Sequence, residues 1–158
     1  VTAITDEDLP QVRRLFGQLP KSRPAPIAII RDSTLKTVVL IPREKGSDEG
    51  EEFACTRWDC TVKTINQFDN PDLYFQRKVG VFIYGIKYPG NAASAGLASQ
   101  DILLKVGDTP ITTLADLKAV HKQTLKTVED DPRIRITVLR NGLMRQIVMD
   151  ISRDYSKD

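Results

Sequence analysis

One stretch of the chain, residues 79–101, constrains the fold more than any other. Its first part, residues 81–86, is apolar at odd and even positions alike, which predicts a strand covered on both faces. Pro89 and Gly90 end that strand, because proline cannot donate to a ladder and glycine tolerates positive φ. The small residues that follow predict one short helical turn, ended by Gly96, and residues 102–106 predict the next buried strand. The stretch therefore indicates a small β-rich core.

The composition of the chain excludes several classes of protein. With 158 residues, of which 41% are apolar and 28% charged, it is typical of one or two globular domains. A net charge of +2 gives no basic excess for nucleic acid, and no window is apolar enough to span a membrane. The chain opens on Val1 rather than Met, so we expect a fragment or a processed product and draw nothing about the compartment from the lack of a signal peptide.

The cysteines and the single histidine are too few for a metal centre. Cys55 and Cys60 lie five positions apart, and His121 is far from both in sequence. We therefore expect no metal and, since no phosphate loop or other cofactor motif is present, no cofactor. A disulfide between the two cysteines and a pair of half-buried thiols both fit the spacing, and we favour the thiols.

The C-terminal part of the chain predicts a β-hairpin. Apolar residues alternate over residues 134–138 and again over 147–149, and Asn141-Gly142 between them is a strong signal for a two-residue turn.

This hairpin has a counterpart near the N-terminus. Arg31 and Arg140 are 109 positions apart, and four apolar pairs share that offset: Ile27 and Ile136, Ile29 and Val138, Val38 and Ile147, and Val39 and Val148. Upstream, Asp8-Leu9 and Asp116-Leu117 each open a helix-like segment at an offset of 108. The chain therefore contains an internal repeat of a helix followed by a hairpin.

Capping signals support both helices of the repeat. Thr112 or Thr113 is a candidate N-cap of the second helix, with Asp116 as its capping-box partner. Thr5 or Asp8 is the candidate for the first.

Residues 79–101 resemble the central signature of a PDZ domain of the HtrA/Deg protease type, which runs strand, PGSPA, AGL and then Gly-Asp before an apolar strand. The matching residues are Gly90, Ala93, Ala95, Gly96, Leu97 and Asp101, whereas Asn91, Ala92 and Gln100 replace the usual Ser, Pro and Gly. The resemblance implies a domain that binds peptides and does no chemistry of its own.

The expected fold is α+β. The resemblance implies a complete PDZ domain over residues 53–153, a partly open antiparallel β-barrel or sandwich capped by two helices. It is preceded by a helix plus β-hairpin, residues 1–45, that resembles the back half of another PDZ domain. Residues 46–52 form a charged linker and 154–158 a tail. Because a helix and two strands can hardly bury a core, we expect residues 1–45 to pack on the second domain, on another chain or on a missing front half.

The resemblance also implies where a peptide would bind. In HtrA-type domains a loop before the first strand receives the peptide carboxylate, and the peptide adds to an edge strand beside a helix. By position residues 57–61 form that loop and 62–65 the edge strand. The implied peptide-binding residues are Arg57, Trp58, Asp59, Cys60, Thr61 and Val62, with Leu114, Lys118 and His121 on the helix.

One of these positions departs from the family pattern. Asp59 replaces the usual glycine and would repel a carboxylate, although Arg57 could compensate. The loop then binds an internal peptide segment, turns Asp59 outward, or does not bind C-termini. Trp58 is either a pocket wall or a buried anchor. Lys118 either meets an acidic ligand residue or is solvated, and for His121 a contact from the helix face is expected rather than catalysis.

Catalytic residues of a serine protease are missing from the sequence, which has no GNSGG-like serine and only His121 as a base. We therefore expect a non-catalytic peptide-binding region of an HtrA/Deg-like serine protease, which recognises C-termini or unfolded segments and resides in the periplasm or another extracytoplasmic compartment. Its expected partners are peptides and sister subunits of a homo-oligomer. The alternatives are a stand-alone PDZ scaffold or oligomerisation module, or the PDZ region of another protease type.

Overall fold

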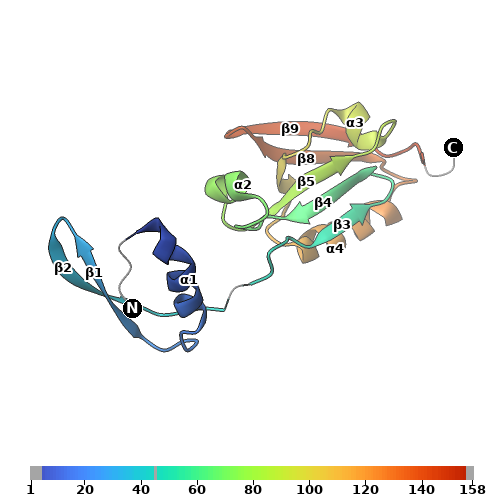
Figure 1. Cartoon of the computed structure of the whole chain (residues 1–158). Helices are drawn as coiled ribbons and strands as arrows, with labels where there is room; N and C mark the ends of the chain where they lie inside the picture. The colour runs from blue at the N-terminus through green and yellow to red at the C-terminus, as the bar shows by residue number, and fades with distance from the viewer. Residues whose placement is uncertain (1–4, 45, 156–158) are drawn as a thin grey trace. The chain divides into compact units, whose positions relative to one another are not determined.

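The computed structural model describes residues 5–44 and 46–155, which separate into two compact units, Val1–Gly46 and Ser47–Asp158 (Figure 1). Each unit is described by itself. Over the described residues, no helix has the length and apolar character that crossing a bilayer requires.

The first unit is a helix followed by a hairpin. A 3₁₀ turn (η1, Asp6–Asp8) leads into α1 (Leu9–Gly17), and β1 (Ala25–Arg31) pairs antiparallel with β2 (Thr34–Leu40). Of the residues described in this unit, Ala25 alone is buried. The unit therefore has regular local structure without a core of its own.

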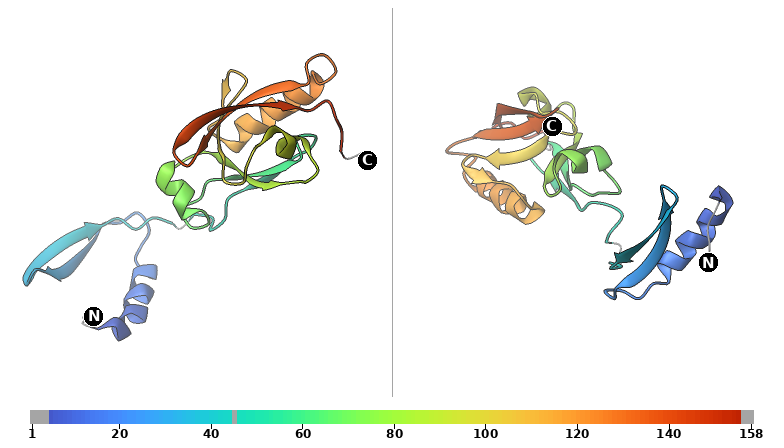
Figure 2. Two further views of the ribbon diagram at one scale, coloured as in Figure 1. Left: turned by 90° about the horizontal axis from the view of Figure 1, so that it is seen from above. Right: turned by 90° about the vertical axis from the view of Figure 1, so that its left-hand side faces the viewer.

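The second unit is built on a seven-stranded antiparallel sheet of order β3-β4-β5-β6-β8-β9, with β7 paired to β6 (Figure 2). The strands are β3 (Glu52–Cys55), β4 (Cys60–Thr64), β5 (Val81–Ile86), β6 (Ile102–Val106), β7 (Thr109–Pro110), β8 (Arg133–Arg140) and β9 (Leu143–Asp150). The helices are α2 (Pro71–Gln76), α3 (Asn91–Ala95) and α4 (Leu114–Lys126). This mixed architecture is the predicted PDZ-like α+β fold.

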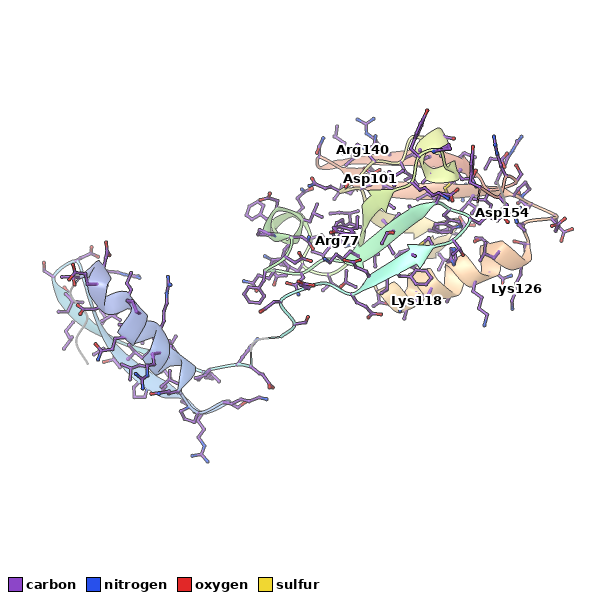
Figure 3. The ribbon with its side chains drawn as sticks, turned by 45° about the vertical axis from the view of Figure 1, so that its right-hand side comes forward. Arg77, Asp101, Lys118, Lys126, Arg140 and Asp154 are labelled. Carbon is purple, nitrogen blue, oxygen red and sulfur yellow. The ribbon has the colours of Figure 1, made fainter. Side chains whose placement is uncertain are left out.

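Residues 79–101, the stretch that most constrains the expected fold, form β5 and the helical turn α3 and lead into β6. Gly96 ends α3 with φ of +81°, a left-handed conformation that favours glycine. The prediction of a strand covered on both faces holds for the first half of β5, whereas Tyr84 in the second half is 49% exposed. The fully buried Asp101 ties the stretch to β8, because Arg140 donates from Nε to its Oδ1 and from Nη2 to its Oδ2, both at 2.6 Å (Figure 3).

The main hydrophobic core of this unit draws on β4, β5, β6, β8 and β9 and on the inner face of α4. Its fully buried large side chains include Trp58, Ile83, Leu103, Ile111, Leu117, Ile136, Met149 and Ile151. A smaller cluster of Ile65, Leu73, Phe82 and Ile102 lies under α2.

The internal repeat is visible in the structure as matched geometry. The backbone N–H of Thr5 donates to Asp8 Oδ2 at 3.0 Å, and that of Thr113 donates to Asp116 Oδ2 at 2.8 Å. The hairpins share one register: Ile27 pairs with Val38 as Ile136 pairs with Ile147. Their two turn residues, Asp32-Ser33 and Asn141-Gly142, all have positive φ, as a type I′ turn requires. The same helix-and-hairpin plan is therefore built twice.

Candidate functional site

The sheet edge next to α4 differs from the sequence expectation. Residues 62–65 were expected as the edge strand, but β4 is paired on both sides, and β3 is the edge. The chain reverses at residues 56–59 and lays β3 antiparallel on β4, with Cys55 opposite Cys60 and Glu52 opposite Lys63. A hairpin rather than a single open strand therefore forms this side of the domain.

Side chains of α4 contact the segment that forms β3. The Phe53 ring meets the His121 ring edge to face at 5.4 Å between centroids, and Lys118 Nζ lies 5.5 Å from the centre of the Phe53 ring. Lys118 Nζ also pairs with Glu51 Oε1 at 2.7 Å. The segment 51–55 thus fills the place between β4 and α4.

Burial along β3 alternates. Phe53 is half-buried and Cys55 buried, whereas Glu52 and Ala54 are exposed. β3 runs antiparallel to β4 and ends at the 56–59 turn.

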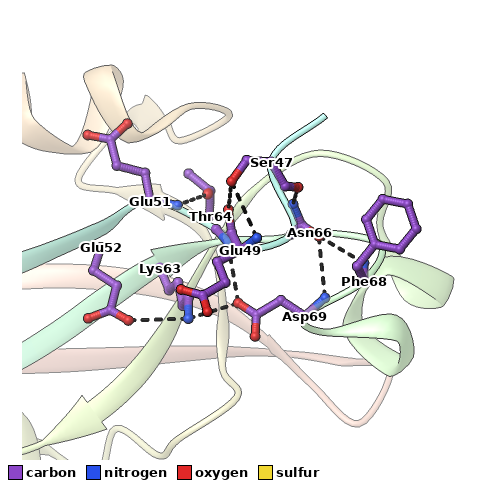
Figure 4. Close-up of polar contacts among 10 residues, drawn as sticks. Ser47, Glu49, Glu51, Glu52, Lys63, Thr64, Asn66, Phe68 and Asp69 are labelled. Carbon is purple, nitrogen blue, oxygen red and sulfur yellow. Dashed lines mark hydrogen bonds and ion pairs between the residues drawn. The ribbon is translucent and has the colours of Figure 1, made fainter. Parts of the chain in front are cut away.

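A buried lysine fixes the far end of β3. Lys63 Nζ lies 2.8 Å from Asp69 Oδ2 and 3.2 Å from Glu52 Oε1 (Figure 4), and it stacks over the Tyr84 ring at 4.7 Å. The hydrogen bond to Asp69, with a smaller one to Glu52, raises the pKa of Lys63 against the opposing effect of burial. Lys63 likewise lowers the pKa of Asp69. The ammonium stays charged and pins β3 to β4.

Asp59, the departure from the family pattern, faces α3. Its Oδ2 accepts the backbone N–H of Asn91 at 3.0 Å. A Cβ on Gly90 would come within 2.6 Å of the Asp59 Cβ, so the two backbones approach closely. Asp59 has φ of +59°, and its backbone N–H donates to Cys55 O at 3.1 Å. Its carboxylate therefore stabilises the loop against α3.

Arg57 is held by the C-terminal segment. Its Nε donates to Ile151 O and its Nη2 to Ser152 O, both at 2.8 Å, and Nη1 lies 3.7 Å from Asp154 Oδ2. The Arg57 guanidinium was expected to offset the negative charge of Asp59. It instead binds backbone carbonyls that lie 94 and 95 residues further along the chain.

Trp58 and His121 form the floor behind β3. Trp58 is fully buried, meets His121 edge to face at 5.2 Å, and its indole N–H has no hydrogen-bond partner among the described residues. Trp58 was expected to be either a pocket wall or a buried anchor, and its complete burial fits the buried anchor. His121 Nε2 donates to Thr56 O at 2.8 Å. Burial lowers the pKa of His121, and that hydrogen bond partly opposes the shift.

The other expected site residues lie close by. Cys60, Val62 and Leu114 are buried in the core cluster, and Thr61 is half-buried on β4. Their role in peptide binding stays a prediction. Sequence reasoning missed Glu51, Glu52 and Phe53, whose only sequence signal was an aromatic residue directly after two acids. Among the described residues no group of three His, Cys, Asp or Glu could hold a metal ion.

Comparison with curated proteins finds a relative that fits this fold. The chain is 31% identical over 77 residues to the serine protease Do-like HtrA of Lactococcus lactis, an alignment covering 49% of this chain and 18% of that protein. The chain contains an HtrA-type PDZ region. It spans less than a fifth of the relative, and no family model matches it.

Solved structures similar to this chain include an HtrA-type protease and two PDZ domains. The HtrA-type protease AlgW with a decapeptide is 20% identical with a TM-score of 0.47, over 65% of this chain and 28% of that one. The HtrA3 PDZ domain bound to a phage-derived ligand is 16% identical with a TM-score of 0.44, over 63% and 84%. The PDZ domain of EpsC from Vibrio cholerae is 15% identical with a TM-score of 0.41, over 59% and 94%.

Proposed function

We propose that this region binds extended peptide segments, C-termini or unfolded stretches, by strand addition in the groove between β4 and α4, and that β3 is a resident strand which the peptide must displace. The observation that carries the proposal is the pairing of β3 with β4, in the direction of a PDZ ligand and with Phe53 against α4. A groove that accepts the chain's own strand has the backbone edge and the side-chain wall that a foreign strand needs.

Displacement of β3 has to break a small number of contacts. The strand has four residues, with Glu52 and Ala54 exposed. The ion pair of Lys118 with Glu51 joins two largely exposed side chains, and such pairs contribute between about 0 and 1 kcal/mol. Phe53, Cys55 and the Glu52–Lys63 contact supply the rest. Because β3 belongs to the same chain as the groove, a free peptide can bind only while β3 has left it. The apparent affinity for the peptide is therefore the intrinsic affinity multiplied by the fraction of time that the groove is open.

A peptide copy of the resident strand tests the proposal. The probe is a fluorescent hexapeptide with the sequence of residues 50–55 and Ser in place of the final Cys, made with a free and with an amidated C-terminus. We expect Phe53→Ala to bind the free-acid probe about tenfold more tightly than the wild type, because the variant's β3 loses its aromatic anchor and the probe supplies one.

Phe75→Ala is the matched control, since Phe75 is 86% exposed on α2. It should bind the probe like the wild type. Loss of binding on amidation would identify carboxylate recognition despite Asp59. Absence of binding to wild type and Phe53→Ala, with both folded by circular dichroism, would contradict the proposal.

The larger protein is part of the proposal. We infer that the HtrA-type PDZ region belongs to a serine protease, to which it delivers or presents substrates. The similarity to a Do-like HtrA supports this, with the chain spanning 18% of that protein. The sequence of the gene upstream of residue 1 tests it: a trypsin-like domain there supports the inference, and its absence would favour a scaffold.

Assembly is a second candidate function, favoured by the first unit. Apolar side chains are exposed on it, including Leu9, Leu15, Phe16, Ile30, Leu35, Val39, Leu40 and Ile41. We propose that residues 1–45 are the back half of a second PDZ-like repeat joined by residues 46–52 to the complete domain 53–153, and that this face is covered by a front half or a sister subunit. Light scattering tests the subunit alternative: a concentration-dependent dimer supports it, and a monomer at all concentrations would exclude it.

A further inference from the structure

Cys55 and Cys60 lie at the point where the resident strand meets the turn. Cys55 is the last residue of β3, Cys60 is the first of β4, and the two are direct Cα partners across the strand pair. Both are free thiols, 1% and 6% exposed. They are therefore more deeply buried than the half-buried thiols that the sequence favoured, and they face each other.

The geometry of this pair fits a disulfide. Directly opposed residues in an antiparallel ladder have Cα atoms about 4.5–5.5 Å apart, and disulfides join Cα atoms about 4.4–6.8 Å apart. The neighbouring Cys60 thiol, followed by burial, raises the pKa of Cys55. Since the two residues are direct partners across the strand pair, bond formation needs little movement of the backbone.

The position of the pair gives a bond there a specific consequence. Cys55 lies next to the 56–59 turn, where the last residue of an added peptide would lie under the proposed function. A covalent link from Cys55 to β4 prevents that position from being vacated. A cavity of about 480 Å³ lies beside the pair and is lined by both cysteines together with Ala54, Thr61 and Gly85.

We propose that Cys55 and Cys60 are a redox pair, oxidised by a low-molecular-weight disulfide to a cross-strand disulfide that holds β3 in the groove and reduced by a thiol to free it. This rests on the proposed function only for its effect on peptide binding. One cysteine thiolate attacks the oxidant and expels one thiol, and the second then attacks the mixed disulfide and expels the other. Two electrons and two protons pass to the oxidant, which becomes two thiols.

The burial of both thiols sets the order of events. Only the thiolate attacks, and in the closed hairpin both sulfur atoms are covered and the Cys55 thiol, with its raised pKa, provides little thiolate. Oxidation therefore proceeds when β3 lifts from β4 and closes the hairpin covalently when it returns. The disulfide converts a transient closed state into a permanent one.

The test follows the full chain in buffers of oxidised and reduced glutathione. Intact mass and alkylation with iodoacetamide report the disulfide, and amide hydrogen exchange of β3 reports the lock without any peptide. We expect loss of two hydrogen atoms and of both alkylation sites, with β3 exchanging about tenfold more slowly after oxidation. The double variant Cys55→Ser and Cys60→Ser should show no response to the oxidant.

Each alternative result has a defined meaning. A persistent pair of free thiols in the folded chain, under conditions in which the urea-unfolded chain forms the disulfide, would overturn the redox pair. A disulfide without slower exchange in β3 would overturn the lock. A disulfide with slowed exchange, but with no binding of the residue 50–55 probe to the reduced wild type or to reduced Phe53→Ala, would support the redox pair and reject the proposed peptide function.

Discussion

The two helix-and-hairpin segments of this chain share their local structure and differ in what covers them. Both have a Thr/Asp capping arrangement and an I′-like two-residue turn, and Ile27–Val38 repeats the pairing of Ile136–Ile147. In the second segment the inward-facing side chains of β8 are buried in the core, and in the first segment those of β1 are mostly half-exposed. Caps and turns are therefore specified locally, whereas a core needs the strands β3 to β6, which the first unit lacks.

The ion pair at the turn end of the second hairpin gives the largest expected difference between the segments. Arg140→Ala leaves the fully buried Asp101 without its bidentate partner and should lower the free energy of unfolding by about 4 kcal/mol. Arg31→Ala, its exposed counterpart, should change it by less than about 0.5 kcal/mol. Urea unfolding followed by fluorescence of Trp58, the only tryptophan, measures both. Equal losses would break the comparison.

Core truncation at matched positions gives the next effect. Ile136 is fully buried, and Ile136→Ala should cost about 3 kcal/mol of unfolding free energy by leaving a cavity. Ile27→Ala, 109 positions earlier and half-buried in a unit without a core, should leave the Trp58 transition unchanged. A shift of that transition by Ile27→Ala would show that the two units are coupled in stability.

The caps are the third matched pair. Thr113→Ala removes the side-chain acceptor of the Asp116 N–H and should cost about 1 kcal/mol in the Trp58 transition. Thr5→Ala should lower the helix content by circular dichroism and leave that transition in place. No loss of stability in Thr113→Ala would mean that α4 is held by packing alone.

A pH dependence gives the smallest effect. Burial lowers the pKa of His121 below its ordinary value of 6.5, so the unfolded chain binds the proton more tightly. Stability is then highest above about pH 6.5 and falls as the pH drops below it. The decrease in unfolding free energy between pH 7.5 and 5.5 should be larger in wild type than in His121→Gln. The same slope in both would contradict the buried neutral imidazole.

Sequence reasoning reached the parts of the fold whose cause is local. Asn141-Gly142 predicted the turn, and Thr113 with Asp116 predicted the cap, because both depend on residues within a few positions. The signature of residues 79–101 predicted β5, α3 and β6 for the same reason. The repeat followed from comparing positions along the chain.

The site could be predicted only in part, because its decisive contacts cross long distances in sequence. The structure places Lys118 and His121 against Phe53 and Thr56, and their role in peptide binding stays a prediction, whereas β3 was not foreseen. Four residues after an acidic linker carry too short a pattern to indicate a strand. The bonds of Arg57 to the carbonyls of Ile151 and Ser152 had no local signal at all.

The central claim is that β3 fills the groove between β4 and α4 and must leave when a peptide binds. The most direct measurement is the nuclear Overhauser contact between the Phe53 and His121 rings, whose centroids lie 5.4 Å apart, in the free protein and after saturation with the residue 50–55 probe. The account predicts a contact in the free form that disappears as the probe binds. A contact that is absent in the free protein, or that persists with the probe bound, would contradict it.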